Sequence, residues 1–291
     1  QREDFTIPMF LKPQNNFNAG ISNAIGIYID KKDHLWILDM GDKSSSPKFI
    51  IWNLKKEKLE KLITIPLDVI RPHSFLQDFA IDEENDFAYI ADMTMGGMGI
   101  KANPAIIAIN IKTGEAKRLL ENSRFVKSKK PMMAEGKMIA SGASKQGVIF
   151  DINPITIDSK NEWVYFGGMS EGEIYRINTA TLRNFNLSRT DLEQKVENMG
   201  YKPYSDGFKI DKKQNIYIGD VNKSEIGIST NKEYKTFIKS PELMWVDGLF
   251  VAKDGYVYAT INQLNRHSNF SSNGKDSSVK PYKIIRFKQA D

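Results

Sequence analysis

The chain has 291 residues, of which 41% are hydrophobic and 26% charged, an ordinary globular balance and a length that suits one large all-β domain or two medium ones. It contains no cysteine, which excludes disulfides, thiol catalysis and thiolate metal sites. The net charge of +5 is scattered over turns beside acidic residues, and no apolar run approaches the roughly 20 residues of a membrane helix, so the sequence predicts neither nucleic-acid binding nor a membrane span.

A pair of predicted strands near the N-terminus recurs along the chain. Residues 26–41, GIYIDKKDHLWILDMG, combine an apolar run ending in Asp, a polar turn, and an aromatic run ending in a second Asp. Similar stretches are DFAIDEENDFAYIADM (78–93), PITIDSKNEWVYFGGM (154–169), GFKIDKKQNIYIGDV (207–221) and GLFVAKDGYVYATIN (248–262). The turn positions are 52, 76, 53 and 41 residues apart, at Asp30, Asp82, Asp158, Asp211 and Ala252.

Each copy predicts a β-hairpin, because the runs are β-branched and aromatic and polar turn residues separate them. Further strand-like runs follow each hairpin, which gives about four antiparallel strands per unit and predicts the blades of an all-β propeller. One domain over 1–291 is expected, with six blades favoured and five as the alternative. Residues 1–20 contain FTIPMFL and would close the ring or form a truncated blade. The one convincing helix lies at 188–200.

The repeated aspartate and aromatic residues have predicted structural roles. The first aspartate of each hairpin is expected to accept hydrogen bonds from backbone amides of the turn. The aromatic residues of the second strands are expected to pack between blades; they are Trp36, Tyr89, Trp163 and Tyr217.

The candidate binding site lies on the face where the chain enters the inner strands and leaves the second strands, since rigid scaffolds carry binding residues on loops. Aligning the inner strands places Gln77, Asn153, Asp206 and Asp247 in one column at the channel mouth. Two carboxylates that converge there require a cation, a proton or a basic group. Oxygen ligands from Asn153, Asp206 and Asp247 suit Ca²⁺ or Mg²⁺.

Other candidates lie on the same face. His73 is a candidate catalytic base or proton donor, and Arg71 a candidate partner for an anionic group. Tyr204 and Trp245, in KPYSDG and LMWVDG, are candidate aromatic contacts for a ligand. No Ser-His-Asp order or nucleophile elbow is present.

Several of these stretches resemble the major royal jelly/yellow protein family. They are IYIDKKDHLWILDMG, SFLQDFAIDEENDFAYIAD, GKMIASGASKQGVIFDINPITID and WVDGLFVAKDGYVYATINQLNR, spread over roughly residues 20 to 266. The resemblance implies a six-bladed, usually exported propeller, in which Asp247 and Asn262 line the channel. The family's cysteines are missing, which favours a bacterial branch, and Gln1 in place of Met indicates a processed chain. A secreted or periplasmic protein whose signal peptide has been removed is therefore expected.

A second resemblance comes from SDGFKIDKKQNIYIGD, residues 205–220. It is similar to the gluconolactonase/senescence-marker-type propellers, which carry a central divalent metal. In position, Asn153 and Asp206 match two metal ligands of that group, whereas the glutamate of its first blade has no clear counterpart here.

Four functions stay open at this point. The first is binding of a small aromatic or cationic molecule in the channel, without catalysis. The second is a metal-dependent lactonase that uses Asn153, Asp206 and Asp247. The third is isomerisation of aromatic quinones, as in a dopachrome tautomerase, and the fourth is a protein-interaction scaffold. Because no catalytic set is complete, ligand binding is favoured, and whether the protein is an enzyme stays open.

Overall fold

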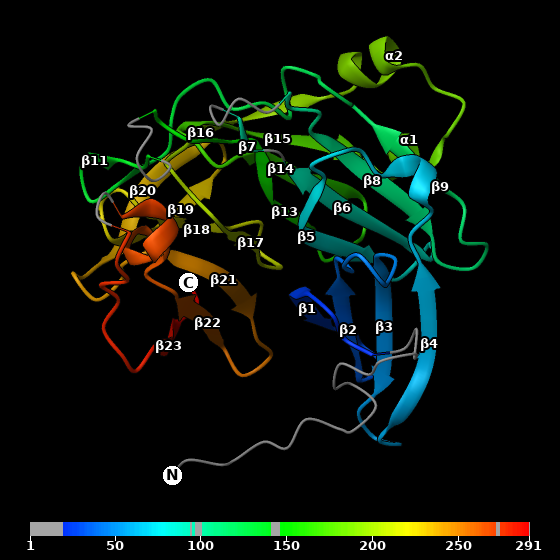
Figure 1. The fold of residues 1–291 in the computed structure, drawn as a ribbon, viewed down its shortest axis with the longest axis horizontal. Coiled ribbons are helices and arrows are strands. Elements are labelled where there is room, and N and C mark those ends of the chain that lie inside the picture. Colours follow the sequence, from blue (N-terminus) through cyan, green and yellow to red (C-terminus); the bar gives the residue numbers. More distant parts are fainter. Residues whose placement is uncertain (1–19, 94, 97–100, 141–145, 272–273, 291) are drawn as a thin grey trace.

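The computed structural model describes residues 20–93, 95–96, 101–140, 146–271 and 274–290. Five antiparallel sheets surround a central axis (Figure 1). Their strands, in chain order within each sheet, are β1 (Ala24–Ile29), β2 (His34–Asp39), β3 (Lys48–Asn53) and β4 (Lys58–Thr64); β5 (Phe75–Asp82), β6 (Phe87–Met93), β8 (Ala105–Asn110) and β9 (Ala116–Leu119); β13 (Ile152–Ile157), β14 (Trp163–Gly168), β15 (Gly172–Asn178) and β16 (Glu197–Lys202); β17 (Phe208–Ile210), β18 (Ile216–Asp220), β19 (Glu225–Thr230) and β20 (Glu233–Lys239); and β21 (Val246–Val251), β22 (Tyr256–Ile261) and β23 (Lys283–Lys288).

The first strand of each sheet lies innermost. Along the ring β1 packs beside β5, β5 beside β13, β13 beside β17, and β17 beside β21. These five strands approach the axis in Figure 1, while β4, β9 and β20 lie at the rim. The prediction of an all-β propeller is therefore confirmed.

The preference for six blades is wrong for the described residues, and the five-blade alternative matches. Four sheets have four strands and the C-terminal sheet has three. The long interval between the second and third hairpins forms no further blade. Besides β8 and β9 of the second blade, its described residues contribute the short pairs β7 (Met95–Gly96) with β12 (Ile149–Phe150) and β10 (Met133–Ala134) with β11 (Lys137–Met138). The predicted ring-closing strand falls in residues 1–19, outside the described residues.

The blades are held together by apolar side chains between neighbouring sheets. Trp36 is 6% exposed, and Tyr89 and Tyr217 are fully buried, which confirms their predicted place between blades. Trp163 is only partly buried, but it too packs between blades, against the cluster that joins the third and fourth sheets. The guanidinium carbon of Arg176 lies 4.1 Å from its ring centroid. The second, third and fourth blades have apolar residues on both faces, because each of these faces packs against a neighbouring blade.

The turn aspartates act as predicted. Asp30 Oδ1 accepts from the backbone nitrogens of Lys32 and His34 at 2.8 and 2.9 Å. Asp211 Oδ1 accepts in the same way from Lys213 and Asn215, both at 2.8 Å. The other oxygen of Asp30 also accepts from Trp36 Nε1 at 2.9 Å. Each of these carboxylates thus ties a hairpin turn to its aromatic second strand.

The predicted helix is shorter than expected. Helix α2 (Arg189–Gln194) begins after Ser188, which forms a capping box with Asp191, and α1 (Thr179–Arg183) precedes it. Gly200 does not end a helix but lies in β16, because residues 197–202 pair with β15. No helix in the described part of the chain is long and apolar enough to cross a membrane.

Candidate functional site

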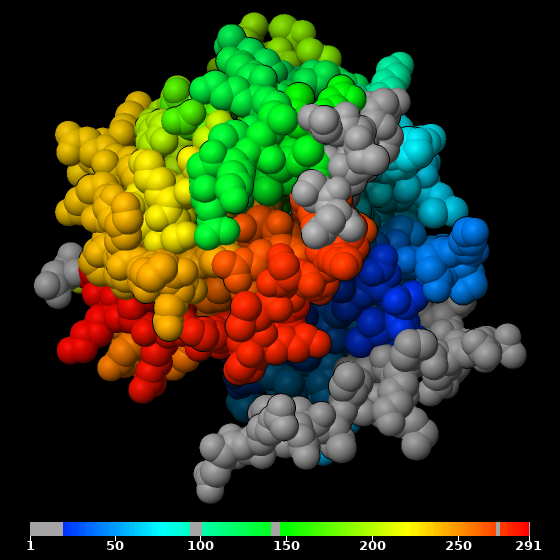
Figure 2. All heavy atoms as spheres, turned by 60° about the vertical axis from the view of Figure 1, so that its left-hand side comes forward, coloured from blue at the N-terminus to red at the C-terminus, as the bar shows by residue number. Residues whose placement is uncertain are grey.

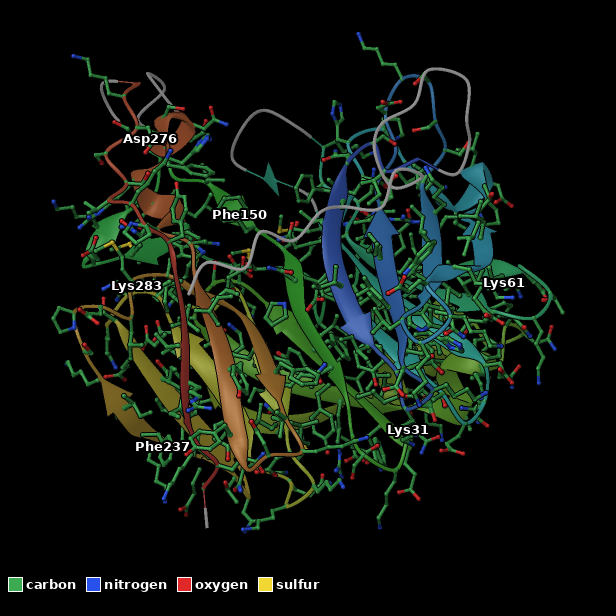
Figure 3. All side chains as sticks on the ribbon, turned by 90° about the horizontal axis from the view of Figure 1, so that it is seen from below. Lys31, Lys61, Phe150, Phe237, Asp276 and Lys283 are labelled. Atoms are coloured by element: carbon green, nitrogen blue, oxygen red, sulfur yellow. The ribbon has the colours of Figure 1, made fainter. Side chains whose placement is uncertain are left out.

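The inner strands enclose a cavity of about 510 Å³. Residues from β1, β5, β13, β17 and β21 line it, together with Tyr258, Ala259 and Thr260 of β22 and Ile284 of β23. Figure 3 shows the N-terminal sheet and the C-terminal sheet on either side of β13. The lining side chains of Ile27 and Ile284 are 72% and 74% exposed. Solvent therefore reaches the cavity between β1 and the C-terminal sheet. In Figure 2 the surface of the C-terminal segment, orange to red, borders that of the N-terminal sheet, blue.

Five of the predicted site residues form a hydrogen-bonded group beside one end of this cavity. Asn153 and Asp247 belong to its lining, whereas Asp206, Trp245 and Asn262 do not. Asn153 donates through Nδ2 to the backbone oxygen of Asp206 at 2.9 Å and to its Oδ1. Trp245 Nε1 donates to Asp206 Oδ2 at 2.5 Å. Asn262 Nδ2 donates to Asp247 Oδ2 at 2.8 Å. The predicted convergence of Asn153, Asp206 and Asp247 from three blades is thus present, with Trp245 and Asn262 as its hydrogen-bond donors.

Close backbone approach makes this convergence possible. A Cβ on Gly207 would lie 1.9 Å from the carbonyl oxygen of Asp247, so only glycine allows β17 and β21 to meet here. Ser205 Oγ donates to Gly207 O at 2.9 Å and closes the turn before β17. The turn formed by Ser205, Asp206 and Gly207 therefore positions the carboxylate of Asp206. Because Gly207 has no side chain, β21 approaches closely enough to place Asp247 beside that carboxylate.

The acid cluster is electrostatically unfavourable as it stands. Burial raises the pKa of Asp206 well above its ordinary value, and repulsion from Asp247 raises it further, against the hydrogen bonds from Trp245 and Asn153. Burial also raises the pKa of Asp247. A positive group placed between them would relieve this cost.

Two charged residues of the cavity lining were missed from the sequence, Asp78 on β5 and Lys209 on β17. Burial raises the pKa of Asp78 to about 7, with Lys209 opposing that rise. Sequence alignment selected Gln77, but a β-bulge between Leu76 and Asp78 shifts the register, so both Gln77 and Asp78 line the cavity. The signal for Lys209 was its place between two buried residues of an inner strand, Phe208 and Ile210.

Gln77 carries an unused acceptor. Its Oε1 is buried and has no hydrogen-bond partner among the described residues. Because leaving such a group unpaired costs free energy, a ligand donor at this end of the cavity would be stabilised.

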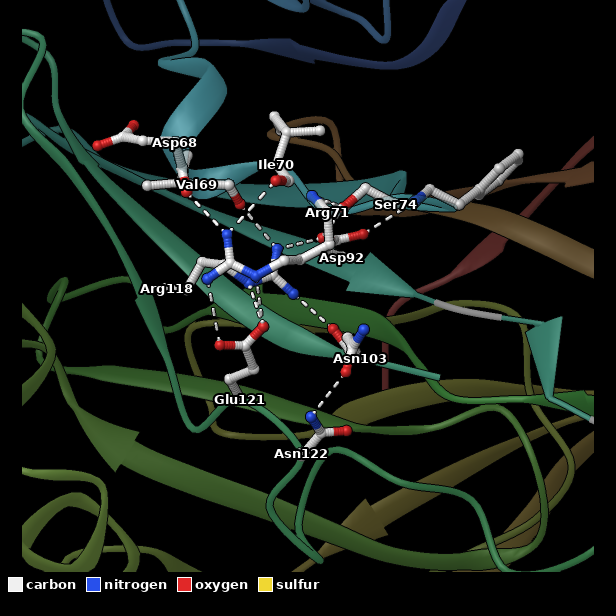
Figure 4. Close-up of polar contacts among 11 residues, drawn as sticks. Asp68, Val69, Ile70, Arg71, Ser74, Asp92, Asn103, Arg118, Glu121 and Asn122 are labelled. Atoms are coloured by element: carbon white, nitrogen blue, oxygen red, sulfur yellow. Dashed lines mark hydrogen bonds and ion pairs between the residues drawn. The ribbon is translucent and has the colours of Figure 1, made fainter. Parts of the chain in front are cut away.

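Three other candidates lie apart from the cavity lining. Arg71 Nε pairs with Glu121 Oε1 at 3.0 Å, and Glu121 also pairs with Arg118 at 3.0 Å. Figure 4 shows this network, in which Arg118 continues to the buried Asp92. The ion pair of Arg71 therefore stabilises the loop before β5, and its guanidinium is not part of the cavity lining. His73 is exposed in a turn with a φ of 69°, and Tyr204 packs against an apolar cluster.

That apolar cluster covers the polar end of the channel. Its buried members, which we call the cap, come from loops and short strands at that end: Met93, Met132, Ala134, Ile139, Val148, Phe150, Met169, Val221 and Trp245. Trp245 is fully buried and so acts on Asp206 rather than as an open ligand contact. The loop face expected to receive a ligand is thus covered by these side chains, and Asp78 and Asp247 are reached from the cavity, whereas Asp206 is buried behind it.

This fold and channel define a five-bladed propeller with an acid-rich central cavity. A family model described as Major royal jelly protein matches residues 22–290. The chain therefore belongs to the major royal jelly protein family, as its motifs indicated.

Individual similarities are more distant. Major royal jelly protein 3 of Apis mellifera is 35% identical over 86 residues, covering 25% of this chain and 16% of that protein. A gluconolactonase from Xanthomonas campestris superposes with a TM-score of 0.50 at 9% identity, covering 81% of this chain and 68% of that one. Virginiamycin B lyase from Staphylococcus aureus has a TM-score of 0.49 and 14% identity, covering 92% and 84%. The gluconolactonase likeness, expected from residues 205–220, is supported at the level of the fold alone.

Proposed function

We propose that the protein binds a small organic cation with an apolar or aromatic body in its central cavity. The observation that carries the proposal is the excess of acid at the cavity. Asp78 and Asp247 line it, and Lys209 is the one basic residue among its described lining residues. Asp206 lies directly behind, where repulsion from Asp247 adds to the cost of its burial. Converging buried carboxylates are costly unless a cation or protons neutralise them. An ammonium would supply positive charge to Asp247 and a donor to Gln77 Oε1.

The rest of the lining suits an apolar body. Ile25 and Ile155 line the cavity, as do the rings of Phe79, Phe208 and Tyr28. Pockets for small molecules combine such walls with a few polar groups that fix orientation. The cavity volume also falls within the common range for small-molecule sites, roughly 300–1,000 Å³.

The lactonase alternative requires a divalent cation on Asn153, Asp206 and Asp247. Asn153 turns its amide nitrogen toward Asp206, and Trp245 donates to the other oxygen of that carboxylate. Both oxygens of Asp206 therefore already accept hydrogen bonds. This donor set fits a hydrogen-bonded acid cluster better than the oxygen shell of Ca²⁺.

The isomerase alternative lacks its candidate acid or base, because His73 does not line the cavity. We therefore favour binding over this chemistry. Export and bacterial origin stay predictions that rest on the family resemblance and the cysteine-free composition.

Isothermal calorimetry and thermal melting test the proposal with three ligands: phenethylamine, its neutral analogue phenethyl alcohol, and Ca²⁺. We expect saturable binding of the amine alone. Asp247→Asn should abolish it, whereas Asp42→Asn should not, since Asp42 lies in an exposed loop apart from the cavity lining and accepts from the backbone nitrogens of Ser44 and Ser45. Binding of Ca²⁺ that Asp247→Asn removes, with no response to the amine, would favour the metal-dependent alternative instead.

A further inference from the structure

The amine of Lys209 lies in the cavity, and the proposed binding of a cation gives it no role. Lys209 lies on β17 and lines the cavity. Its Nζ is 5.5 Å from the ring centroid of Tyr28 on β1, across the axis. No residue of the described ranges accepts a hydrogen bond from this Nζ. The amine is therefore enclosed by protein yet open to a molecule in the cavity.

We propose that Lys209 is an imine-forming lysine that captures small aldehydes with an apolar body inside the cavity. Three observations of geometry carry this: the amine lines the cavity, lacks a hydrogen-bond acceptor among the described residues, and has a carboxyl group, Asp78, on the same lining. Apolar walls from Phe208 and Ile155 would hold the body of the aldehyde.

Electrostatics supports the same role. Burial lowers the pKa of Lys209, and Asp78 opposes that fall. The pKa of Asp78 itself is raised to about 7. The other neighbour, Tyr28, is neutral and donates its hydroxyl proton to Glu83 Oε1 at 2.7 Å. A desolvated lysine has a larger neutral fraction near pH 7, and only the neutral amine is a nucleophile.

The chemical step balances without a further reactant. The Nζ lone pair forms a bond to the carbonyl carbon, the C=O π pair moves to oxygen, and a proton passes from nitrogen to that oxygen. Asp78 then protonates the carbinolamine hydroxyl, which leaves as water while the C=N bond forms. Loss of the remaining N–H proton to Asp78 leaves a neutral imine and restores the acid.

Lys202 provides an internal comparison. Burial lowers its pKa to about 7, but it is fully buried and its Nζ donates to Pro203 O at 2.7 Å. It does not line the cavity. A lowered pKa without access should leave Lys202 unreactive, so the two lysines separate the effect of cavity access from that of burial.

Reductive trapping tests the proposal. The protein is incubated with benzaldehyde and cyanoborohydride at pH 7, and peptide mass spectrometry gives the labelling rate at each lysine. We expect Lys209 to be labelled several-fold faster than the exposed Lys212 and Lys253, since burial lowers the pKa of Lys209 and so raises its neutral fraction. Labelling spread over exposed lysines, with Lys209 unmodified in the folded protein, would overturn the proposal.

Two variants complete the test. Lys209→Arg keeps the positive charge and should lose the fast label, whereas Lys212→Arg should keep it; loss in both variants would contradict the assignment. Asp78→Asn should slow labelling of Lys209 several-fold in protein that circular dichroism shows to be folded, and an unchanged rate would refute the role of Asp78 as the proton donor. Amine binding is measured with phenethylamine, which contains no carbonyl, so the imine proposal and the proposed function succeed or fail separately.

Discussion

Trp245 Nε1 donates a 2.5 Å hydrogen bond to Asp206 Oδ2, joining two buried residues of neighbouring blades that are 39 positions apart. Trp245 adopts a positive φ of 55°, and its ring belongs to the cap. One side chain therefore both covers the end of the channel and lowers the pKa of the acid beneath it, against the rise caused by burial.

Trp245→Phe should remove this donor and weaken amine binding. Losing a hydrogen bond to a buried carboxylate costs about 1–3 kcal/mol, and Asp206 would become harder to ionise. Trp36→Phe is the matched control, because Trp36 Nε1 donates to the turn residue Asp30 at 2.9 Å. Urea unfolding should show both variants destabilised, while calorimetry shows weaker amine binding only for Trp245→Phe. Equal affinities in the two variants would mean that Asp206 takes no part in binding.

Protein stability without a ligand should fall between about pH 4 and pH 7. The pKa of Asp78 in the folded state, about 7, lies above its value in the unfolded chain, about 3.9. The folded state therefore holds the extra proton across this window, so the free energy of unfolding decreases as pH rises through it. Thermal melts at pH 4.5 and 7.5 measure the slope. Asp78→Asn should reduce it and Asp254→Asn should not.

Amine binding should have the opposite dependence on pH. A bound ammonium favours ionised carboxylates, so affinity should increase between pH 5 and pH 8 as Asp78 loses its proton, while phenethylamine stays charged. Calorimetry across this range, on the wild type and Asp78→Asn, gives the proton linkage. A flat affinity profile in the wild type would remove Asp78 from the binding site.

Gly207→Ala should disrupt the acid cluster. The new Cβ would lie 1.9 Å from the carbonyl oxygen of Asp247, so the inner strands β17 and β21 would have to separate. We expect a loss of stability of several kcal/mol, within the range for an overpacked core, together with loss of amine binding. Gly172→Ala is the control, because its Cβ would meet only Ser170 O at 4.0 Å. A fully stable Gly207→Ala protein that still binds the amine would contradict the close approach.

Removing residues 1–19 tests their predicted role in closing the ring. The described ranges leave Ile27 and Ile284 largely exposed on two sides of the cavity, and FTIPMFL, residues 5–11, precedes β1 in sequence. If this segment covers that side, its deletion should lower the melting temperature and increase the fluorescence of a dye that binds apolar surface. Unchanged melting and dye fluorescence would show that other residues, or none, cover it.

Much of the fold was predictable because its signals are local. Alternation of apolar and polar residues predicted the strands, and the aspartate of each turn was assigned correctly since its hydrogen bonds reach amides only two to four residues away, as at Asp211. The column of Asn153, Asp206 and Asp247 was also predictable, because equivalent positions of repeated hairpins face the same axis. These inferences need only the period of a strand and the repetition of one unit.

The remaining features depend on contacts between distant segments. The number of blades depends on the angle between neighbouring sheets around the axis, and the sequence pattern of a single hairpin does not indicate that angle. The bulge at Gln77 brings Asp78 into the cavity, and the cap places Trp245 over Asp206, although neither is visible in a repeat. Residues of five blades become neighbours only when the ring forms. The sequence alone therefore determined which side chains approach the axis, and tertiary packing decided which of them share a cavity and from which side a ligand reaches it.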